Sequence, residues 1–125
     1  MNKQMETKQA ESASTATIPY ADWQKLDLRV GKILKVEDHP NADKLYLLEV
    51  DLGKALGKRK IVAGLKKYYK PKDLKGKLCT VFVNLQPAEI RGIKSEGMVL
   101  AATDEANDKV QIIAPKKLEL GAKVR

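Results

Sequence analysis

The sequence has one cysteine and one histidine among its 125 residues. The lone Cys79 has no partner for an internal disulfide, so nothing in the chain requires an oxidising compartment. It lies in an apolar run, which favours a small buried side chain over a reactive thiol. One His and one Cys cannot build the His/Cys clusters that bind structural zinc. We therefore expect neither a metal site nor a bound cofactor.

Sequence motifs of catalysis are also missing. His39 and Ser95 are the only conceivable parts of a hydrolytic triad, and no G-x-S-x-G elbow surrounds the serine. The phosphate-binding pattern G-x-x-x-x-G-K-[ST] is absent as well. His39 precedes a proline, which is typical of a turn. We find no active site and predict that the chain is not an enzyme.

Long apolar runs are absent too. No stretch approaches the roughly 18 apolar residues that a membrane span requires, and residues 1–17 lack the apolar centre of a signal peptide. We therefore expect no membrane partner and a cytoplasmic location. Residues 1–17 are rich in Gln, Ser, Thr, Lys and Glu, a composition that favours a disordered tail or linker. Residues 18–125 are then a single domain.

Short apolar segments separated by turn residues follow a lead-in over 18–26 that favours a short helix. The pattern predicts strands over 28–36, 46–52, 58–64, 78–85 and 97–102, with a short pairing at 110–113 and a last stretch near 124. Residues 66–76 resemble a helix, with Pro71 early and Gly76 at the end. Five strands with a helix between the third and fourth match the order of the OB-fold. We predict an all-β, five-stranded OB-fold barrel with a short helix and terminal extensions.

The first predicted strand has one irregularity. Leu28, Val30, Leu34 and Val36 share one parity and should face the core, whereas Lys32 interrupts them. Because Gly31 stands beside this exception, we expect a β-bulge there.

The positive charge is concentrated in one part of the chain. The sequence has 24 Lys and Arg against 16 Asp and Glu. Residues 54–77 alone carry ten basic residues and one acidic residue, whereas the rest of 18–125 is close to neutral. A local excess of this kind neutralises phosphates, although it also occurs on merely solvated surfaces. The candidate electrostatic footprint comprises Lys58, Arg59, Lys60, Lys66, Lys67 and Lys70. Tyr68 and Tyr69, within it, can either stack on unpaired bases or pack on the barrel.

Five blocks carry a specific resemblance: LDLRVGKI at 26–33, HPNADKL at 39–45, IVAGLKKYY at 61–69, NLQPA at 84–88 and RGIKSEGMVL at 91–100. Together they resemble the tRNA-binding domain family, which includes the C-terminal or β-subunit domain of methionyl-tRNA synthetase and free-standing tRNA-binding proteins. The resemblance implies a domain that binds tRNA non-catalytically and recognises the shape of the outer corner of the tRNA. It further implies that the domain aids an aminoacyl-tRNA synthetase, of which the methionyl enzyme is the first candidate.

The resemblance also implies a set of RNA contacts. Positively charged side chains suit phosphates, amides and hydroxyls suit sugars or base edges, and a thioether suits the face of a base. The implied residues are Lys44, Asn84, Arg91, Lys94, Ser95 and Met98. Three of these also have structural interpretations, because Asn84 can cap a strand end, Ser95 can hold a turn and Met98 can belong to the core.

Two further points stay open at this stage. The chain ends just past the predicted barrel, as in the dimeric members of the family, so we expect a homodimer with apolar surface from residues 18–23. The alternative function is that of an export chaperone with a similar barrel, which binds unfolded polypeptides. The 39–45 block and the basic stretch favour RNA.

Overall fold

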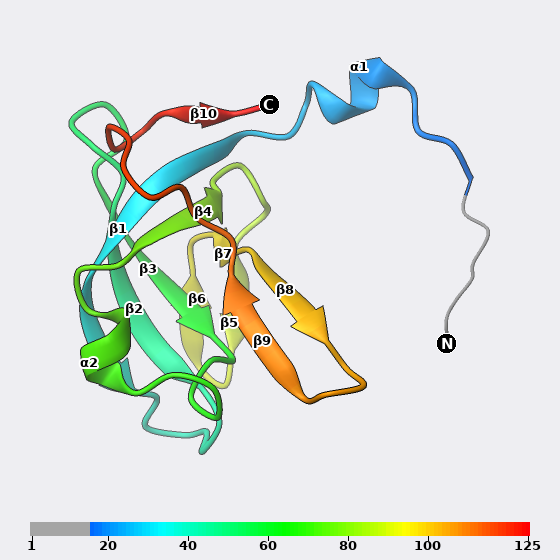
Figure 1. Cartoon of the computed structure of the whole chain (residues 1–125). Helices are drawn as coiled ribbons and strands as arrows, with labels where there is room; N and C mark the ends of the chain where they lie inside the picture. The colour runs from blue at the N-terminus through cyan, green and yellow to red at the C-terminus, as the bar shows by residue number, and fades with distance from the viewer. Residues whose placement is uncertain (1–15) are drawn as a thin grey trace.

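A long, bent strand organises the structure, a computed structural model that describes residues 16–125 (Figure 1). This strand, β1 (Leu28–Asp38), pairs with β4 (Leu78–Phe82) through its first half and with β2 (Tyr46–Asp51) through its second half. The strand β3 (Lys58–Ala63) extends the sheet beyond β2, and β7 (Met98–Val99) extends it beyond β4. All these pairings are antiparallel.

The sheet curls until β3 meets the segment that leads into β7. The backbone N–H of Glu96 donates to the carbonyl oxygen of Lys60 at 2.8 Å, and the N–H of Val62 donates to Ser95 Oγ at 2.9 Å. These bonds nearly close a five-stranded antiparallel barrel. The helix α2 (Pro71–Leu74) lies between β3 and β4 in the chain. The predicted all-β OB-fold is therefore confirmed.

The barrel interior is filled mainly by aliphatic side chains from β1, β2, β3 and β4. The residues that are almost completely buried include Val30, Ile33, Leu48, Val50, Ile61, Leu74, Cys79 and Val81. Burial raises the pKa of the Cys79 thiol to about 12, so the protonated form dominates at neutral pH. The prediction that Cys79 is a small buried side chain is confirmed.

The bulge in β1 lies further along the strand than the sequence pattern predicted. The register of the β1–β2 pairing shifts between Ile33 and Lys35, so Leu34 is the extra residue. Ile33 is therefore completely buried against Val50, whereas Leu34 is partly exposed. The prediction that Leu34 continues the inward face is wrong. Gly31 contributes in another way, because a Cβ there would lie 2.7 Å from Val50 Cγ1.

The helix between β3 and β4 is shorter than the predicted range of 66–76. Only Pro71–Leu74 is helical, and Leu74 anchors it in the core. The residue before a proline disfavours the helical conformation, and Lys70 is accordingly extended (φ −84°, ψ 155°). Residues 66–69 instead form a turn in which the N–H groups of Tyr68 and Tyr69 both donate to the carbonyl of Leu65.

Two hairpins are added to the barrel. β5 (Ala88–Ile90) pairs with β6 (Ile93–Ser95), and β8 (Ala101–Asp104) pairs with β9 (Lys109–Ile112). The predicted fourth strand ends early, at Phe82, and the predicted fifth strand divides at Leu100 into β7 and β8. Leu100 lies where the two pairings meet: its N–H donates to the carbonyl of Thr80 of β4, and its carbonyl accepts the N–H of Ile113, which follows β9.

The C-terminal end of the described chain pairs with β1, and the N-terminal end extends beyond the start of β1. The terminal strand β10 (Lys123–Val124) pairs with β1 at Arg29 and Leu28. The lead-in contains the short helix α1 (Tyr20–Trp23), which projects away from the barrel (Figure 1). Of the tail expected over 1–17, residues 1–15 lie outside the described residues.

Candidate nucleic-acid interface

The loop between β1 and β2 is fastened to the β5–β6 hairpin by His39, which is only 4% exposed. Its Nδ1 accepts the backbone N–H of Asn41 at 3.0 Å, so the ring proton resides on Nε2. Nε2 then donates to the carbonyl oxygen of Ile90, also at 3.0 Å. The side-chain amide of Asn41 donates to the carbonyl of Arg91 at 3.3 Å. Two segments that are remote in the sequence are thereby held together.

The tip of this hairpin is a two-residue turn. Ile90 pairs with Ile93, and the intervening Arg91 and Gly92 have φ values of 52° and 87°. Consecutive positive φ values are the mark of the type I′ turn, which matches the twist of a β-hairpin. Glycine adopts this conformation freely, but a residue with a Cβ pays about 1 kcal/mol. Arg91 is thus held in an unusual backbone conformation with its side chain exposed.

The same contacts bring Lys44 and Arg91 together. Both line one surface hollow, together with Ala42, Asp43 and Leu45. Two positively charged groups converge there from separate loops, and both residues are exposed. Asp43 adds one negative charge to the same hollow, which leaves a net positive charge suited to an anion such as a phosphate.

Lys94 and Met98 lie on the strands that follow the turn. Lys94 is exposed on β6, opposite Glu89 of β5. Met98 lies on β7 and is 42% exposed, so it does not belong to the core. The side chain of Met98 is thus available for an apolar contact.

Asn84 and Ser95 have structural hydrogen bonds instead. The amide of Asn84 accepts from the N–H of Asp27 at 2.8 Å and donates to the carbonyl of Lys25 at 2.7 Å, which fastens the end of β4 to the start of β1. Ser95 is 4% exposed, and its hydroxyl accepts from Val62 and donates to the carbonyl of Gly97. The structure does not bring the Ser95 hydroxyl to the surface.

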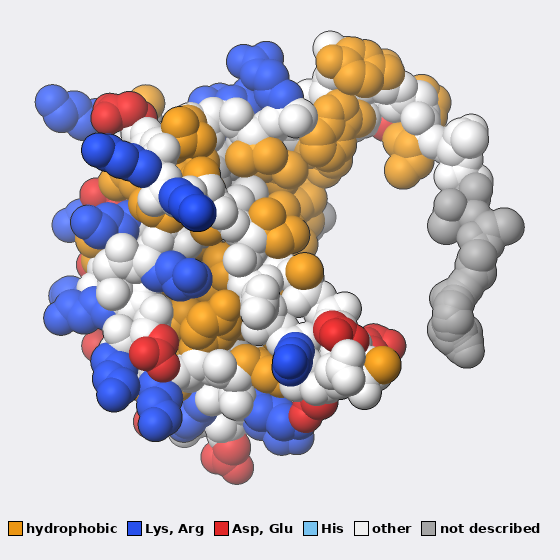
Figure 2. All heavy atoms as spheres, viewed as in Figure 1, with side chains coloured by type: hydrophobic (Ala, Val, Ile, Leu, Met, Phe, Trp, Pro, Cys, Tyr) orange, Lys and Arg blue, Asp and Glu red, His pale blue; other side chains and the backbone are white. Residues whose placement is uncertain are grey.

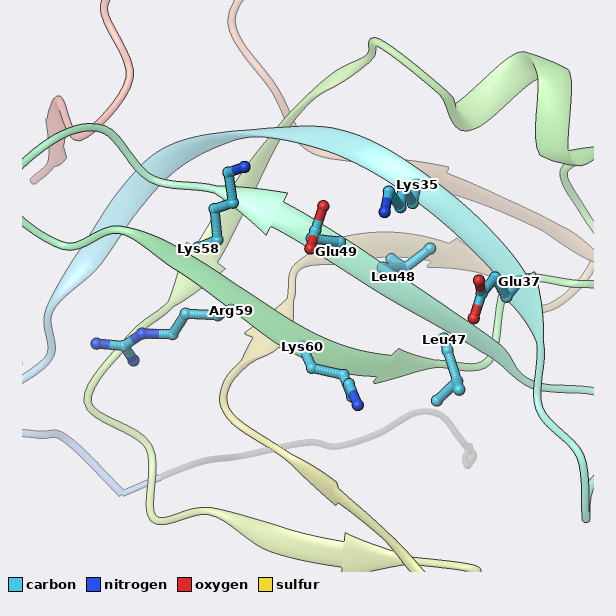
Figure 3. A pocket seen from close by; sticks show the side chains of 8 residues that line it. All are labelled: Lys35, Glu37, Leu47, Leu48, Glu49, Lys58, Arg59 and Lys60. Atoms are coloured by element: carbon cyan, nitrogen blue, oxygen red, sulfur yellow. The ribbon is translucent and has the colours of Figure 1, made fainter.

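The outer face of β1, β2 and β3 contains a second hollow (Figure 3), lined by Lys35, Glu37, Leu47, Leu48, Glu49, Lys58, Arg59 and Lys60. OB-folds commonly bind oligonucleotides on this face and on the two loops beside it. Charges alternate across the strands, because Glu49 lies opposite both Lys35 and Lys60. Arg59 differs from its neighbours, since its guanidinium donates to the carbonyl of Val83 at 2.6 Å.

Two of the three remaining footprint residues have acidic partners. Lys66 forms an ion pair with Asp38 at 3.1 Å, and Lys67 forms one with Asp108 at 2.7 Å. Lys70 is exposed before α2. Two of these three positive charges are therefore partly neutralised within the chain, which reduces what they offer to a polyanion.

Asp108 also accepts the Tyr68 hydroxyl at 2.9 Å. The hydrogen bond from Lys67, and then that from Tyr68, lowers the pKa of the Asp108 carboxyl. The hydroxyl of Tyr69 instead accepts the N–H of Ile112 at 3.0 Å. Both tyrosines thus fasten the turn before α2 to the β8–β9 hairpin. The sequence-based alternative in which they pack on the barrel is supported for Tyr69, which contacts the core.

His39 and Asn41 were interpreted from the sequence only as turn residues. The signal that could have identified them is their position in the HPNADKL block, directly before Lys44. Other kinds of site do not emerge from residues 16–125: no group of three or more His, Cys, Asp or Glu side chains could hold a metal ion there. Within the same residues, no helix is both long and apolar enough to traverse a bilayer.

The fold and this surface define a class of protein: a small OB-fold barrel with two exposed basic residues on loops that are fastened together, suited to binding a polyanion. A family model described as "Putative tRNA binding domain" matches residues 28–123. The chain belongs to this tRNA-binding domain family. The sequence resemblance is therefore confirmed, and the family is defined by binding and not by a catalysed reaction.

Known relatives agree with this assignment. The chain is 55% identical over 109 residues to methionine–tRNA ligase of Pyrococcus horikoshii, a match that covers 86% of this chain and 14% of the ligase. The chain thus spans about one seventh of that relative's length. A methionyl-tRNA synthetase-related protein from Pyrococcus horikoshii has a similar structure, with a TM-score of 0.80 at 32% identity, covering 89% of this chain and all of that one. The chaperone CsaA of Bacillus anthracis has a TM-score of 0.77 at 35% identity, covering 88% and 100%.

Proposed function

We propose that the chain binds folded tRNA by its shape, at the outer corner of the L, and catalyses no reaction itself. The observation that carries this proposal is the hollow in which Lys44 and Arg91 converge, because His39 and Asn41 hold the two loops in fixed positions. Because the chain belongs to the tRNA-binding domain family, we take tRNA to be the polyanion that this hollow binds.

The proposed contacts explain why shape is recognised in preference to sequence. Lys44, Arg91 and Lys94 contact phosphates, which are the same in every tRNA, while Met98 packs against a sugar or a base. Asn84 remains in the proposed set through its exposed amide, and Ser95 contributes by holding the hairpin against β3. The exposed Lys58 and Lys60 steer the polyanion towards this surface.

The proposed partner is methionyl-tRNA synthetase. The relatives that carry this segment include archaeal methionine–tRNA ligases, in which it makes up a small share of the protein. A domain that holds tRNA nearby raises its effective concentration at an active site elsewhere. We accordingly assign residues 18–125 to the binding domain and 1–17 to a tail or linker, and we place the protein in the cytoplasm.

The proposed assembly is a homodimer. Ile18 and Tyr20 are more than 70% exposed, and Trp23 is also exposed. Tyr20 and Trp23 line a hollow together with Leu26 and with Val124 of β10, so apolar side chains from both ends of the described chain meet there, beside the polar Gln24, Lys123 and Arg125. A second copy is the occupant expected there. Sedimentation at micromolar concentration should give the mass of two chains, and the mass of one chain would contradict the dimer.

A chaperone function is the second candidate. It is favoured by the similarity to CsaA proteins, which extends over the whole of those chains. A chaperone of this kind binds unfolded polypeptides through apolar surface, so its affinity should persist at high salt. Binding of tRNA should instead fall steeply with salt, because phosphate contacts release counterions.

The deciding experiment is a fluorescence titration of the protein with mixed intact tRNAs at two salt concentrations. Duplex RNA of equal length and a permanently unfolded polypeptide serve as competing ligands. We expect tight, salt-sensitive binding that prefers tRNA. Lys44→Ala and Arg91→Ala should each weaken it by roughly 1–3 kcal/mol for all elongator tRNAs alike.

The other outcomes are equally informative. Equal affinity for tRNA and duplex RNA would contradict recognition by shape and leave only a basic surface. Salt-resistant binding of the polypeptide without tRNA binding would establish the chaperone function. A loss confined to one tRNA in the Lys44→Ala variant would contradict contacts to phosphates.

A further inference from the structure

A fourth hollow lies between the C-terminal segment and the connection from β2 to β3. Four lysines line it: Lys32 from β1, Lys54 from the connection, and Lys116 and Lys117 from the C-terminal segment. The remaining lining residues are Gly53, Gly76, Leu78, Leu118, Glu119 and Leu120. Glu119 is the one acidic residue among them. The hollow therefore carries a net positive charge.

The backbone that bears these lysines is firmly held. A Cβ on Gly53 would lie 2.9 Å from the carbonyl oxygen of Leu120, and a Cβ on Gly121 would lie 2.9 Å from that of Leu52. The connection and the C-terminal segment thus pack backbone against backbone. The N–H of Gly121 also donates to the carbonyl of Val30 at 2.8 Å. Lys54 and Lys117 are therefore held near one another by the fold.

The four lysines lack acidic partners within the described chain. Among residues 16–125, the ion pairs are made by other side chains, and none of these four takes part. Like charges that converge without counterions disfavour the folded state and attract a polyanion. Figure 2 shows basic side chains gathered over the C-terminal segment and the β2–β3 connection.

This hollow is separate from the one that contains Lys44 and Arg91. The loop 39–45 precedes β2, whereas residues 52–57 follow it, so the two hollows lie at opposite ends of that strand (Figure 1). β2 has six residues, and a strand rises about 3.4 Å per residue, which puts the two on the order of 20 Å apart. A folded tRNA is long enough to reach both, whereas a single phosphate is not.

We propose that this hollow is a second phosphate-binding area, which contacts the backbone of the same tRNA away from the Lys44–Arg91 hollow. The inference rests on the proposed function. Each lysine ammonium can donate to phosphodiester oxygens and release a condensed counterion. Two areas at opposite ends of β2 favour a ligand of a definite size and curvature over a short duplex.

The test compares two variants that each lose two positive charges. Lys116→Gln/Lys117→Gln removes charge from the hollow, and Lys72→Gln/Lys109→Gln removes the same charge from exposed positions in α2 and β9. The affinity of each for mixed tRNA is measured over a series of salt concentrations. We expect the first variant to lower the salt slope by about 1–2 and the affinity by about tenfold at low salt. The control should change the slope little.

Lysine acetylation with and without saturating tRNA gives an independent measurement on the unaltered protein. Lys32, Lys54, Lys116 and Lys117 should be protected, and Lys72 should stay reactive. Equal slopes for both double variants, together with unprotected hollow lysines, would overturn this inference while leaving tRNA binding intact. Failure of the unaltered protein to bind tRNA would instead overturn the proposed function. Equal protection by anionic vesicles would identify a general polyanion surface and also overturn the inference.

Discussion

The imidazole Nε2 of His39 lies 3.0 Å from the carbonyl oxygen of Ile90, although the two residues are 51 positions apart. This bond joins the loop that carries Lys44 to the hairpin that carries Arg91. A buried carbonyl that loses its donor costs about 1–3 kcal/mol. The single histidine of the chain therefore positions a surface without belonging to it.

We expect His39→Ala to lower the free energy of unfolding by about 1–3 kcal/mol. The affinity for tRNA should fall about threefold to tenfold, because Lys44 and Arg91 are no longer held together. The salt slope should not change, since no charge is removed. Urea unfolding and salt-dependent titration check these expectations, and a reduced slope would show that the ring contacts phosphate directly.

Arg91 permits stability and binding to be separated. Asn tolerates a positive φ better than Arg or Ala does, so Arg91→Asn should keep or raise the melting temperature. Arg91→Ala keeps the same Cβ penalty as Arg and should leave the melting temperature nearly unchanged. Both variants lose the guanidinium and should bind tRNA more weakly by roughly the same 1–3 kcal/mol. If Arg91→Asn bound like the unaltered protein, Arg91 would have a conformational role only.

Substitution of Ser95 should act mainly on the stability of the fold and only secondarily on the affinity for tRNA. Ser95→Ala leaves the buried N–H of Val62 without an acceptor, which costs about 1–3 kcal/mol. Thr103→Ala, at an exposed position of β8, should change the stability by less than about 0.5 kcal/mol. Hydrogen exchange of the Val62 amide reports directly on this hydrogen bond. An unchanged Val62 exchange rate in Ser95→Ala would argue against this role.

The contact between Asp108 and its two partners should depend on pH. The pKa of Asp108 is lowered in the folded state, first by Lys67 and then by Tyr68. The resulting stabilisation is fully present above the unfolded pKa of about 3.9 and is lost as the pH falls through the lowered folded value. Asp108→Asn removes it, and Asn accepts the φ of 52° at this position.

Melting curves from pH 7 to pH 2 test this expectation. The difference between the unaltered protein and Asp108→Asn should be small, because the site is exposed, and it should vanish at the acidic end. Glu105→Gln, in the same turn, serves as the matched control. A difference that persists at pH 2 would show that the carboxylate charge is not its source.

Much of the barrel could be predicted from local pattern. Alternation in β2, the turn residues of 39–43 and the apolar run around Cys79 each follow from side-chain period and propensity. The β5–β6 hairpin was not predicted, because its strands are three residues long and its turn contains Arg91 at a position where Asn or Gly is typical. The bulge was misplaced because register depends on the partner strand: Ile33 pairs with Val50 and Lys35 with Glu49, a relationship that the residue pattern of β1 alone does not contain.

The identity of the family was determined by the sequence itself, since the blocks that carry the resemblance are local. The prediction that Lys44 and Arg91 contact RNA comes from the same blocks. Tertiary structure alone decided which charges act together. Lys54 belongs with Lys116 and Lys117 instead of with its neighbours in the 54–77 stretch, and Lys67 is paired with Asp108. The physical reason is that electrostatic interactions depend on distance in space, whereas a charge count along the chain measures only distance in sequence.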